Sequence, residues 1–466
     1  MPTAGTPIVA VLPIRAGSDA DSYVATGLTD DIIDLLTGSP GLRIAPLWDA
    51  SGDPREVARK AGANALFDAS IRRLPDGTLR LSARLVGVAE GFQLWSRRVD
   101  GDSTSLVAQI GQLCVEIGDA LAVHVRAVGR GASTDPRAVD LYLRARHLMR
   151  VPELEPALVA LDEAVALAPD DPAILSAHAN ALSRLSFFGG SVHGDASAYR
   201  RRAQVSATRA LDLAPYMGEP WSALSAVRAG EGDYVGAARA AKTAVSHSPG
   251  LVRAQEQVAS IMVECGRFDD AIARLRAALA LDATNIARGE LARAYALLGR
   301  WPEVDAVLAT LRTDSPGSRF GRLTMLARMR MWDPTRPEAV DDVGLDPTRG
   351  GPITQFTWWA RAVVRGELPP PQLIAFVQFA ATANGPRTIA IAGQMTAEIY
   401  AASGQYEQVL PLIELAMQGS FFDLGWMDLC PVLAPLRGEP KFAEVRARVA
   451  ERVALLTAAL DGPPEG

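Results

Sequence analysis

Residues 249–283, PGLVRAQEQVASIMVECGRFDDAIARLRAALALDA, form one unit of a pattern that recurs along the middle of the chain. The unit contains two helical segments joined by the turn Gly266-Arg267-Phe268. The same kind of turn, a glycine followed two residues later by an aromatic residue, recurs at Gly232-Asp233-Tyr234, Gly299-Arg300-Trp301 and Gly404-Gln405-Tyr406. Successive units close at steps of 34, 34 and 33 residues, at Pro215, Pro249, Ala283 and Pro316.

A period of about 34 residues with two helices per period is typical of tetratricopeptide arrays. Such arrays stack helix hairpins into a superhelix with an extended concave face, which usually holds another protein. We therefore expect an all-α solenoid with a C-terminal cap over residues 137–460, preceded by a linker at 129–136. The Gly- and Pro-rich tail at 461–466 is expected to be disordered.

One unit of this array is too long. Between Pro172 and Pro215 there are about ten residues more than a standard hairpin needs, and the excess lies around Phe187 and Phe188. Insertions in repeats fall in loops, often on a binding face, so these two phenylalanines are candidates for partner contact. The alternative, that they pack onto their own helices, is favoured because large exposed apolar side chains are uncommon.

Residues 1–128 differ from the array and predict an α/β domain. Apolar or alternating runs predict strands at 8–12, 42–44, 65–72, 79–85 and 93–97. Helices are expected at 29–36, 55–61 and 106–125. Thr29 is a suitable N-cap for the first helix, and Asp30 and Asp31 would then favour the positive end of its dipole.

Three motifs of this domain, at 8–13 (IVAVLP), 27–32 (GLTDDI) and 94–97 (LWSR), resemble the TolB-like amino-terminal domain and occur in its order. The resemblance covers most of residues 7–125 and implies a regulatory or sensing role rather than catalysis. In that family the module often lies between a tetratricopeptide array and an effector, commonly a winged-helix DNA-binding domain or a class III adenylate cyclase. Only six residues precede the domain here, so we expect either a stand-alone relative or the regulatory portion of a longer protein.

Composition narrows the choice of function. The net charge is −6, and neither part of the chain is basic, so we expect neither direct nucleic-acid binding nor membrane attachment. The three cysteines, at 114, 265 and 430, are too scattered for a disulfide framework or a metal motif. With no signal peptide or long apolar segment, the expected location is the cytoplasm.

No catalytic signature is present. The chain lacks the phosphate-binding glycine loops, the H-E-x-x-H zinc motif and the G-x-S-x-G nucleophile motif, and its five histidines share no ligand spacing. Asp30 and Asp31 are the best acid pair, but adjacent residues of a helix point about 100° apart. We predict no catalytic residue, no cofactor and no metal, and hence no enzyme.

The sequence therefore predicts a non-enzymatic regulatory scaffold that binds a protein or peptide partner through the concave face of the array. The alternative is the sensory portion of a transcription regulator or adenylate cyclase, and self-association stays open. Because tetratricopeptide arrays usually bind through the first helix of each hairpin, Arg228 and Gln255 are candidate binding residues, beside Phe187 and Phe188.

Overall fold

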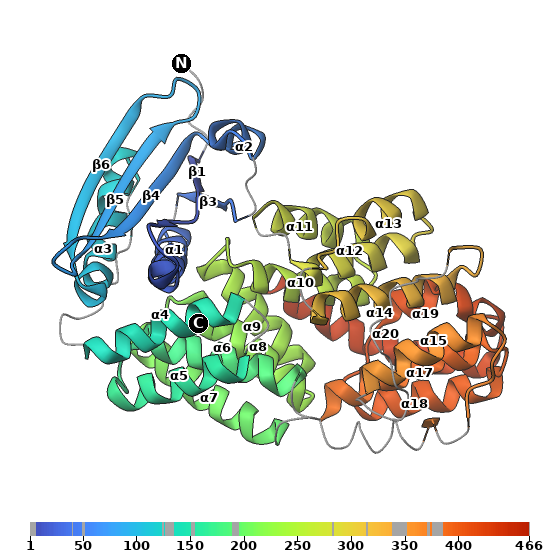
Figure 1. The fold of residues 1–466 in the computed structure, drawn as a ribbon. Helices are drawn as coiled ribbons and strands as arrows, with labels where there is room; N and C mark the ends of the chain where they lie inside the picture. The colour runs from blue at the N-terminus through green and yellow to red at the C-terminus, as the bar shows by residue number, and fades with distance from the viewer. Residues whose placement is uncertain are drawn as a thin grey trace.

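The computed structural model describes residues 6–39, 41–48, 52–123, 125, 135–150, 154–188, 195–281, 284–313, 316–337, 352–370, 373–374 and 385–465. A sheet with three helices precedes an array of helix hairpins (Figure 1). The predicted fold class, an α/β N-terminal part followed by an α-solenoid, is confirmed.

The N-terminal sheet is mixed. Its strands are β1 (Ile8–Val11), β2 (Arg15–Ala16), β3 (Arg43–Pro46), β4 (Ala65–Arg73), β5 (Leu79–Gly87) and β6 (Gln93–Gly101). They lie in the order β3-β1-β4-β5-β6, with β2 beside β4. β1 is parallel to β3 and β4, whereas β4, β5 and β6 are antiparallel. The continuous apolar run of β1 is almost wholly buried, and β5 alternates between buried and partly exposed residues, as their sequences predict.

Helices cover both faces of this sheet. Helices α1 (Ser22–Thr37) and α3 (Ser103–Ala120) share one apolar cluster with Val9, Phe67 and Leu85 of the strands. Helix α2 (Pro54–Lys60) packs on the opposite face, where Ala10 and Leu66 point. Neighbouring residues of one strand thus point to opposite layers, because side chains alternate along a strand.

Helix α1 begins at Ser22, not at Thr29, so the predicted N-cap is wrong. The Thr29 hydroxyl donates to the carbonyl of Ala25 at 2.7 Å and accepts the N–H of Ile14 at 3.0 Å. Asp30 and Asp31 consequently lie past the middle of α1. The helix dipole acts within the first turn and does not explain their position.

The array begins with five hairpins of paired helices in the described part. Their helices are α4 (Pro136–Arg150), α5 (Leu154–Leu167), α6 (Pro172–Phe188), α7 (Ala196–Leu213), α8 (Gly218–Glu231), α9 (Tyr234–His247), α10 (Val252–Glu264), α11 (Phe268–Leu281), α12 (Asn285–Leu297) and α13 (Trp301–Leu308). The further helices that the structure describes in full are α14 (Pro316–Trp332), α15 (Pro352–Val364), α17 (Pro386–Ala402), α18 (Val409–Gln418), α19 (Leu424–Leu429) and α20 (Pro440–Asp461). Short 3-10 turns lie at Asp19–Asp21, Tyr406–Gln408 and Pro431–Leu436.

The recurring glycines make the turns that the sequence predicted. Gly232, Gly266, Gly299 and Gly404 have φ angles of 90°, 79°, 68° and 78°, in the left-handed region that side chains other than glycine rarely adopt. In the first of these turns the Asp233 carboxylate accepts the N–H of Gly236 at 2.8 Å and so caps α9.

The α/β part and the first repeats share one apolar core. The cluster that includes Phe67 of the sheet continues through α1 into Leu143 of α4 and Leu161 of α5. Helices α1 and α4 approach closely at Gly27, where a Cβ atom would lie only 2.3 Å from Leu143 Cδ2. The two parts therefore pack as neighbours within one core, although residues 126–134 between them lie outside the described residues.

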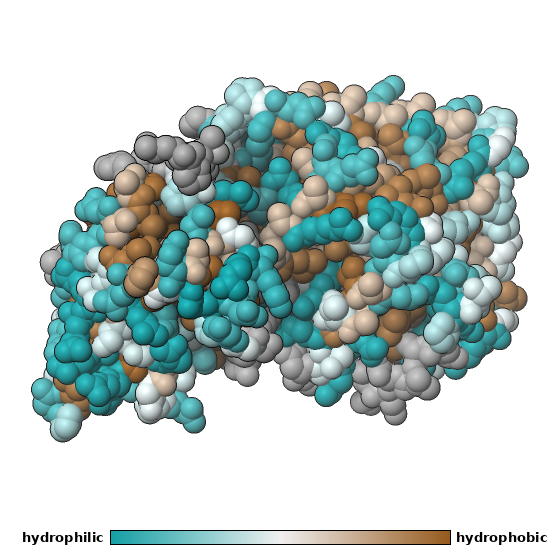
Figure 2. Space-filling model, turned by 90° about the horizontal axis from the view of Figure 1, so that it is seen from above, coloured by the Kyte–Doolittle hydropathy of each residue, from teal (hydrophilic) through white to brown (hydrophobic). Residues whose placement is uncertain are grey.

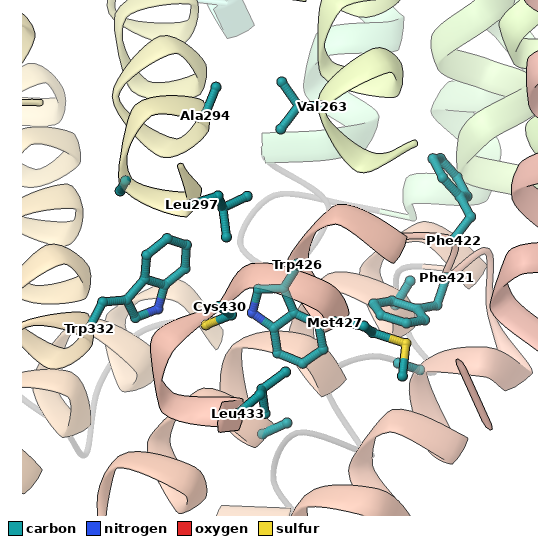
Figure 3. Close-up of a cluster of buried hydrophobic side chains, with 14 of the residues drawn as sticks. Val263, Ala294, Leu297, Trp332, Phe421, Phe422, Trp426, Met427, Cys430 and Leu433 are labelled. Atoms are coloured by element: carbon teal, nitrogen blue, oxygen red, sulfur yellow. The ribbon is translucent and has the colours of Figure 1, made fainter. Parts of the chain in front are cut away.

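The C-terminal elements fold back onto the ends of α8, α10 and α12. Arg387 of α17 donates to Glu264 at 2.5 Å, and Gly425 of α19 lies against the carbonyl of Val263. Figure 3 shows Trp426 of α19 among Leu297, Trp332, Cys430 and Leu433. Trp426 is 0% exposed and anchors this closure.

The expectation of a disordered tail is corrected. Residues 461–465 are described and lie against α9, where Gly462 and Glu465 make hydrogen bonds. The composition of the tail predicted disorder because its glycines and prolines offer no apolar side chain that could pack on the array. The observed contacts are polar instead.

Candidate functional site

The C-terminal tail meets the array at Arg228, one of the predicted binding residues. Arg228, near the end of α8, donates from Nη1 to both carboxylate oxygens of Glu465, at 2.7 and 2.9 Å. The N–H of Glu465 donates to the hydroxyl oxygen of Thr243 at 2.7 Å. Lys242 Nζ donates to the backbone carbonyl of Leu460 at 2.6 Å. Arg228 is thus half-buried, and the tail of the same chain covers it.

Two further contacts extend this surface. Lys242 also donates to the carbonyl of Gly462, and Arg267 donates to the carboxylate of Asp461 at 2.8 Å. We call Arg228, Lys242, Thr243 and Arg267 the tail-binding surface. This surface binds acidic side chains and backbone atoms of the tail, and no apolar side chain takes part in these hydrogen bonds.

Gln255, another predicted binding residue, is not brought to this surface. Gln255 donates to the carbonyl of Pro249 at 2.5 Å and accepts from Arg274, so both ends of its amide are used within its own hairpin. Phe187 and Phe188 are the last residues of α6, and their side chains lie outside the described residues.

Sequence reasoning missed a buried ionic network between α1 and the array. Arg146 of α4, 8% exposed, donates to Asp34 at 2.7 Å and to Glu219 at 3.0 and 3.1 Å. Glu219 in turn accepts from Ser176 at 3.0 Å and from Asn180 at 2.9 Å. One arginine therefore joins the N-terminal domain to the first three hairpins.

The acidic pair of α1 belongs to the same network. The Tyr142 hydroxyl donates to Asp31 at 2.5 Å, and Arg150 donates to Asp30 at 2.5 Å. Asp30 is 7% exposed. These carboxylates hold α1 on α4. Their hydrogen bonds to α4, and not the helix dipole, explain why two acidic residues occur here.

The crowding of carboxylates changes the protonation of this network. Burial raises the pKa of Asp34 to about 7; Arg146 opposes the rise, and Glu219 adds to it. Burial lowers the pKa of Arg146, but Glu219 and the neighbouring acids outweigh it and leave that pKa well above the ordinary value. Arg146 is therefore a permanent cation at the interface, whereas Asp34 titrates near neutral pH.

A second buried pair lies where the C-terminal elements close on α12. Arg293 and Asp423 form an ion pair, with side chains 6% and 2% exposed. Gln394 donates to Asp423 at 2.7 Å. Burial raises the pKa of Asp423 to about 6, against the lowering effect of Arg293. Arg293 also pairs with Glu290 at 3.2 Å, although its Nε is buried without a hydrogen-bond partner among the described residues.

The described residues offer no other chemistry of note. They contain no group of three or more His, Cys, Asp or Glu that could hold a metal ion. Cys114, Cys265 and Cys430 are buried free thiols, and burial raises the pKa of each. Within the same residues, no helix has the length and apolarity needed to cross a membrane.

Exposed large apolar side chains are spread over several elements of the described part. Phe92, Val159, Val205 and Leu368 are each at least 68% exposed, and they lie far apart in the sequence. Figure 2 shows hydrophobic and hydrophilic residues interspersed on the face seen from above. Scattered apolar residues of this kind are normal for a protein surface and do not define a docking patch.

Comparison with known protein families finds a match, and it lies in the array. A family model of the tetratricopeptide repeat matches residues 228–288, a stretch that contains both Arg228 and Gln255. The helical part of the chain thus contains tetratricopeptide repeats. No curated protein matches the sequence.

Solved structures give low overall similarity. A tetratricopeptide repeat protein of Thermus thermophilus is 21% identical over 41% of this chain and 98% of its own, with a TM-score of 0.33. One from Parabacteroides merdae is 13% identical over 69% of this chain and 100% of its own, with a TM-score of 0.30. PelC of Paraburkholderia phytofirmans is 20% identical over 26% of this chain and 92% of its own, with a TM-score of 0.20.

Proposed function

We propose that this protein is a non-enzymatic regulatory scaffold whose repeats bind an extended acidic segment of a partner protein at the tail-binding surface. Tetratricopeptide repeats are protein-interaction modules, and this is the general basis of the proposal. The regulatory part rests on the resemblance of residues 7–125 to the TolB-like domain. The observation that carries the choice of surface is the pairing of Arg228 with Glu465.

The tail's contacts define the chemistry of the partner. Carboxylates accept from Arg228 and Arg267, and backbone carbonyls accept from Lys242. A segment of another protein with acidic side chains and free backbone groups would satisfy the same donors. The specificity would come from the spacing of its acids, which in the tail are at Asp461 and Glu465.

The tail is held weakly enough to be displaced. The side chains of Arg228 and Glu465 are 29% and 24% exposed, and those of Arg267 and Asp461 are 30% and 60% exposed. Ion pairs that face solvent contribute roughly 0–1 kcal/mol each. A partner that supplies the same contacts at higher local concentration would therefore compete with the tail.

The test uses a chain truncated after Leu460 and a fluorescein-labelled peptide with the sequence of residues 458–466. We expect saturable binding by fluorescence anisotropy, at least fivefold weaker binding to the full chain, and loss of binding with Arg228→Gln plus Lys242→Gln. The matched control is Arg239→Gln, an exposed arginine that lies on α9 with Lys242, and it should leave binding unchanged.

Two results would contradict the proposed binding of an acidic segment at the tail-binding surface. No binding of the peptide to the truncated chain would remove the tail-binding surface. Binding that persists in the double variant but falls with Arg239→Gln would show that the peptide binds at a different place on the array. In either case a partner found by cross-linking elsewhere on the array would leave the scaffold role standing without this surface.

A further inference from the structure

Strand β6 is the open edge of the N-terminal sheet. In the described part of the chain no strand pairs with its outer side, and β5 and α3 make the main contacts with it. At the other end of the sheet, β3 lies against α11 of the array. Figure 1 shows β6 at the outer margin of the molecule, away from the array. β6 therefore presents a row of backbone N–H and C=O groups with which another strand could pair.

The side chains of β6 alternate between two different faces. Val99 lies opposite Leu81 of β5, and both are buried in the apolar cluster that α1 and α3 share with the sheet. Arg98 and Asp100 precede and follow Val99, so they point to the other face of the sheet. Both residues are exposed. The edge thus carries a cation and an anion on one solvent-facing side.

Neither of these two charges is fully used within the chain. Among the described residues, Arg98 makes no hydrogen bond and no ion pair through its side chain. Asp100 accepts two hydrogen bonds from Arg80, at 2.7 and 2.6 Å, and 42% of its side chain is exposed. A carboxylate has about four acceptor sites, so Asp100 has room for a second guanidinium group.

These charges distinguish between the registers in which β6 could pair with its own copy. Residues directly opposite in an antiparallel pair point to the same face, so a two-fold pair must place one residue opposite itself. Centred on Arg97, Arg98 or Asp100, the pair would bring like charges directly opposite each other, which is destabilising. Centred on Ser96 or on an earlier residue of β6, it would leave Arg98 and Asp100 without an opposite charge.

The register centred on Val99 is different. It places Arg98 of each copy directly opposite Asp100 of the other copy, so that two ion pairs form on the solvent-facing side. On the other face it places the two Val99 side chains opposite each other, beside the apolar cluster of each copy. β6 is therefore complementary to itself in this register.

We infer that the chain forms a two-fold dimer in which β6 pairs antiparallel with β6 of a second copy, in the register centred on Val99. The two N-terminal sheets then join into one continuous sheet. The dimer does not involve the tail-binding surface, which lies on the array. Its formation is therefore independent of the function proposed for that surface.

The pattern of charge on β6 differs from that of a protected edge. Charged side chains and bulges usually keep edge strands from pairing, and β6 has an irregularity opposite Leu85 and Val86. An edge that carries charges of one sign repels its own copy in every register. β6 carries both signs on its solvent-facing side, and Arg97 on the other face is already paired with Glu116. Such an edge excludes most registers but not the one centred on Val99.

The paired segment is short, because Asp102 caps α3 directly after the strand. In this register it comprises residues 97–101 of each copy. Small interfaces are typical of weak, transient association. The dimer should therefore dissociate on dilution, and the concentration must be varied in any test.

The test is sedimentation equilibrium of the full chain at about 1–200 μM, a range that covers weak association. We expect a concentration-dependent monomer–dimer equilibrium for the natural chain. Arg98→Glu and Asp100→Lys should each raise the dimer Kd about tenfold or more, because two-fold symmetry turns both ion pairs into like-charge pairs at once. The matched control is Arg72→Glu, at an exposed arginine on the same face of the sheet but on β4, and it should leave Kd unchanged.

Mixing the two single variants gives a sharper readout. In a dimer of Arg98→Glu with Asp100→Lys, both contacts again join opposite charges, whereas each variant alone has two repulsive contacts. Equal amounts should therefore restore dimerisation, and native mass spectrometry should find the mixed dimer in excess of either homodimer. A purely structural role of the two residues predicts no such rescue.

Three results would overturn the inference. The first is a natural chain that sediments as a monomer over the whole range. The second is a dimer that both single variants form equally well, since it would then lie at another surface. The third is a mixture that stays monomeric although circular dichroism shows both variants to be folded.

Discussion

The contact between Gly27 and Leu143 can be tested by adding a single methyl group. A Cβ atom at position 27 would lie 2.3 Å from Leu143 Cδ2 and 3.2 Å from Leu143 Cα. Carbon atoms pack best at about 3.5–4.0 Å, so the new atom would be more than 1 Å too close. Leu143 is 0% exposed and has little room to turn away.

Two opposing terms set the expected magnitude for Gly27→Ala. Overpacking a filled core costs about 1–3 kcal/mol. Alanine in place of glycine within a helix returns about 1 kcal/mol. We therefore expect a net loss of about 0–2 kcal/mol in the free energy of unfolding for Gly27→Ala, and a larger loss for Gly27→Val.

The assay is urea unfolding followed by tryptophan fluorescence, with Gly321→Ala as the control. Gly321 lies inside α14, and a Cβ atom there would meet nothing within 4 Å, so that variant should gain about 0.5–1 kcal/mol. Leu143→Ala should cost less in the Gly27→Ala background than in the natural chain, because the clash is gone. If Gly27→Ala stabilises the protein as much as Gly321→Ala does, the close approach of α1 and α4 is refuted.

Three further predictions concern charge and backbone. Folded Asp34, with its pKa raised to about 7, keeps its proton where the unfolded carboxyl (~3.9) has lost it, so the free energy of unfolding should fall as pH rises from about 4 to about 7. Because 42% of that side chain is exposed, the free energy of unfolding will change by only a fraction of ~1.4 kcal/mol per pH unit. Urea titrations at each pH should show a flatter dependence for Asp34→Asn. An unchanged dependence on pH would exclude Asp34 as its source. Asp423→Ala removes the more buried of the two carboxylates that pair with Arg293 and should cost up to about 3–5 kcal/mol in urea unfolding. Asp423→Leu with Arg293→Met should cost much less, and equal losses would contradict this. Gly266→Ala meets no neighbouring atom, so its cost of about 1–2 kcal/mol should come from backbone strain at φ 79° alone, and no loss of Tm would argue against that turn geometry.

The repeat array was predictable because its signals are local. Each glycine–aromatic turn and each closing proline lies within one period, and the left-handed φ of Gly266 follows from the need for a tight turn. The strands of the N-terminal domain were predictable for the same reason, since β1 and β5 carry complete patterns of their own.

The interfaces were not predictable, because their partners are distant in sequence. Thr29 has the chemistry of an N-cap, but α1 begins at Ser22, and its residue Gly27 lies against Leu143 of α4. Asp34 meets Arg146 across 112 positions, and Arg228 meets Glu465 across 237. No local pattern marks such pairs. Arg228 was predicted from the repeat register as a partner-binding residue, and that stays a prediction, whereas its contact with Glu465 of the same chain was not foreseen.

The fold-back of α17–α20 onto α8–α12 has a mechanical consequence. An open solenoid behaves as a spring, since each repeat touches only its neighbours and small rotations add along its length. Here Arg387–Glu264 and Arg293–Asp423 fasten distant coils to one another. Pulling on the two ends of this array should therefore give a stiff response up to one abrupt rupture at these fastenings, followed by the soft extension of an ordinary solenoid.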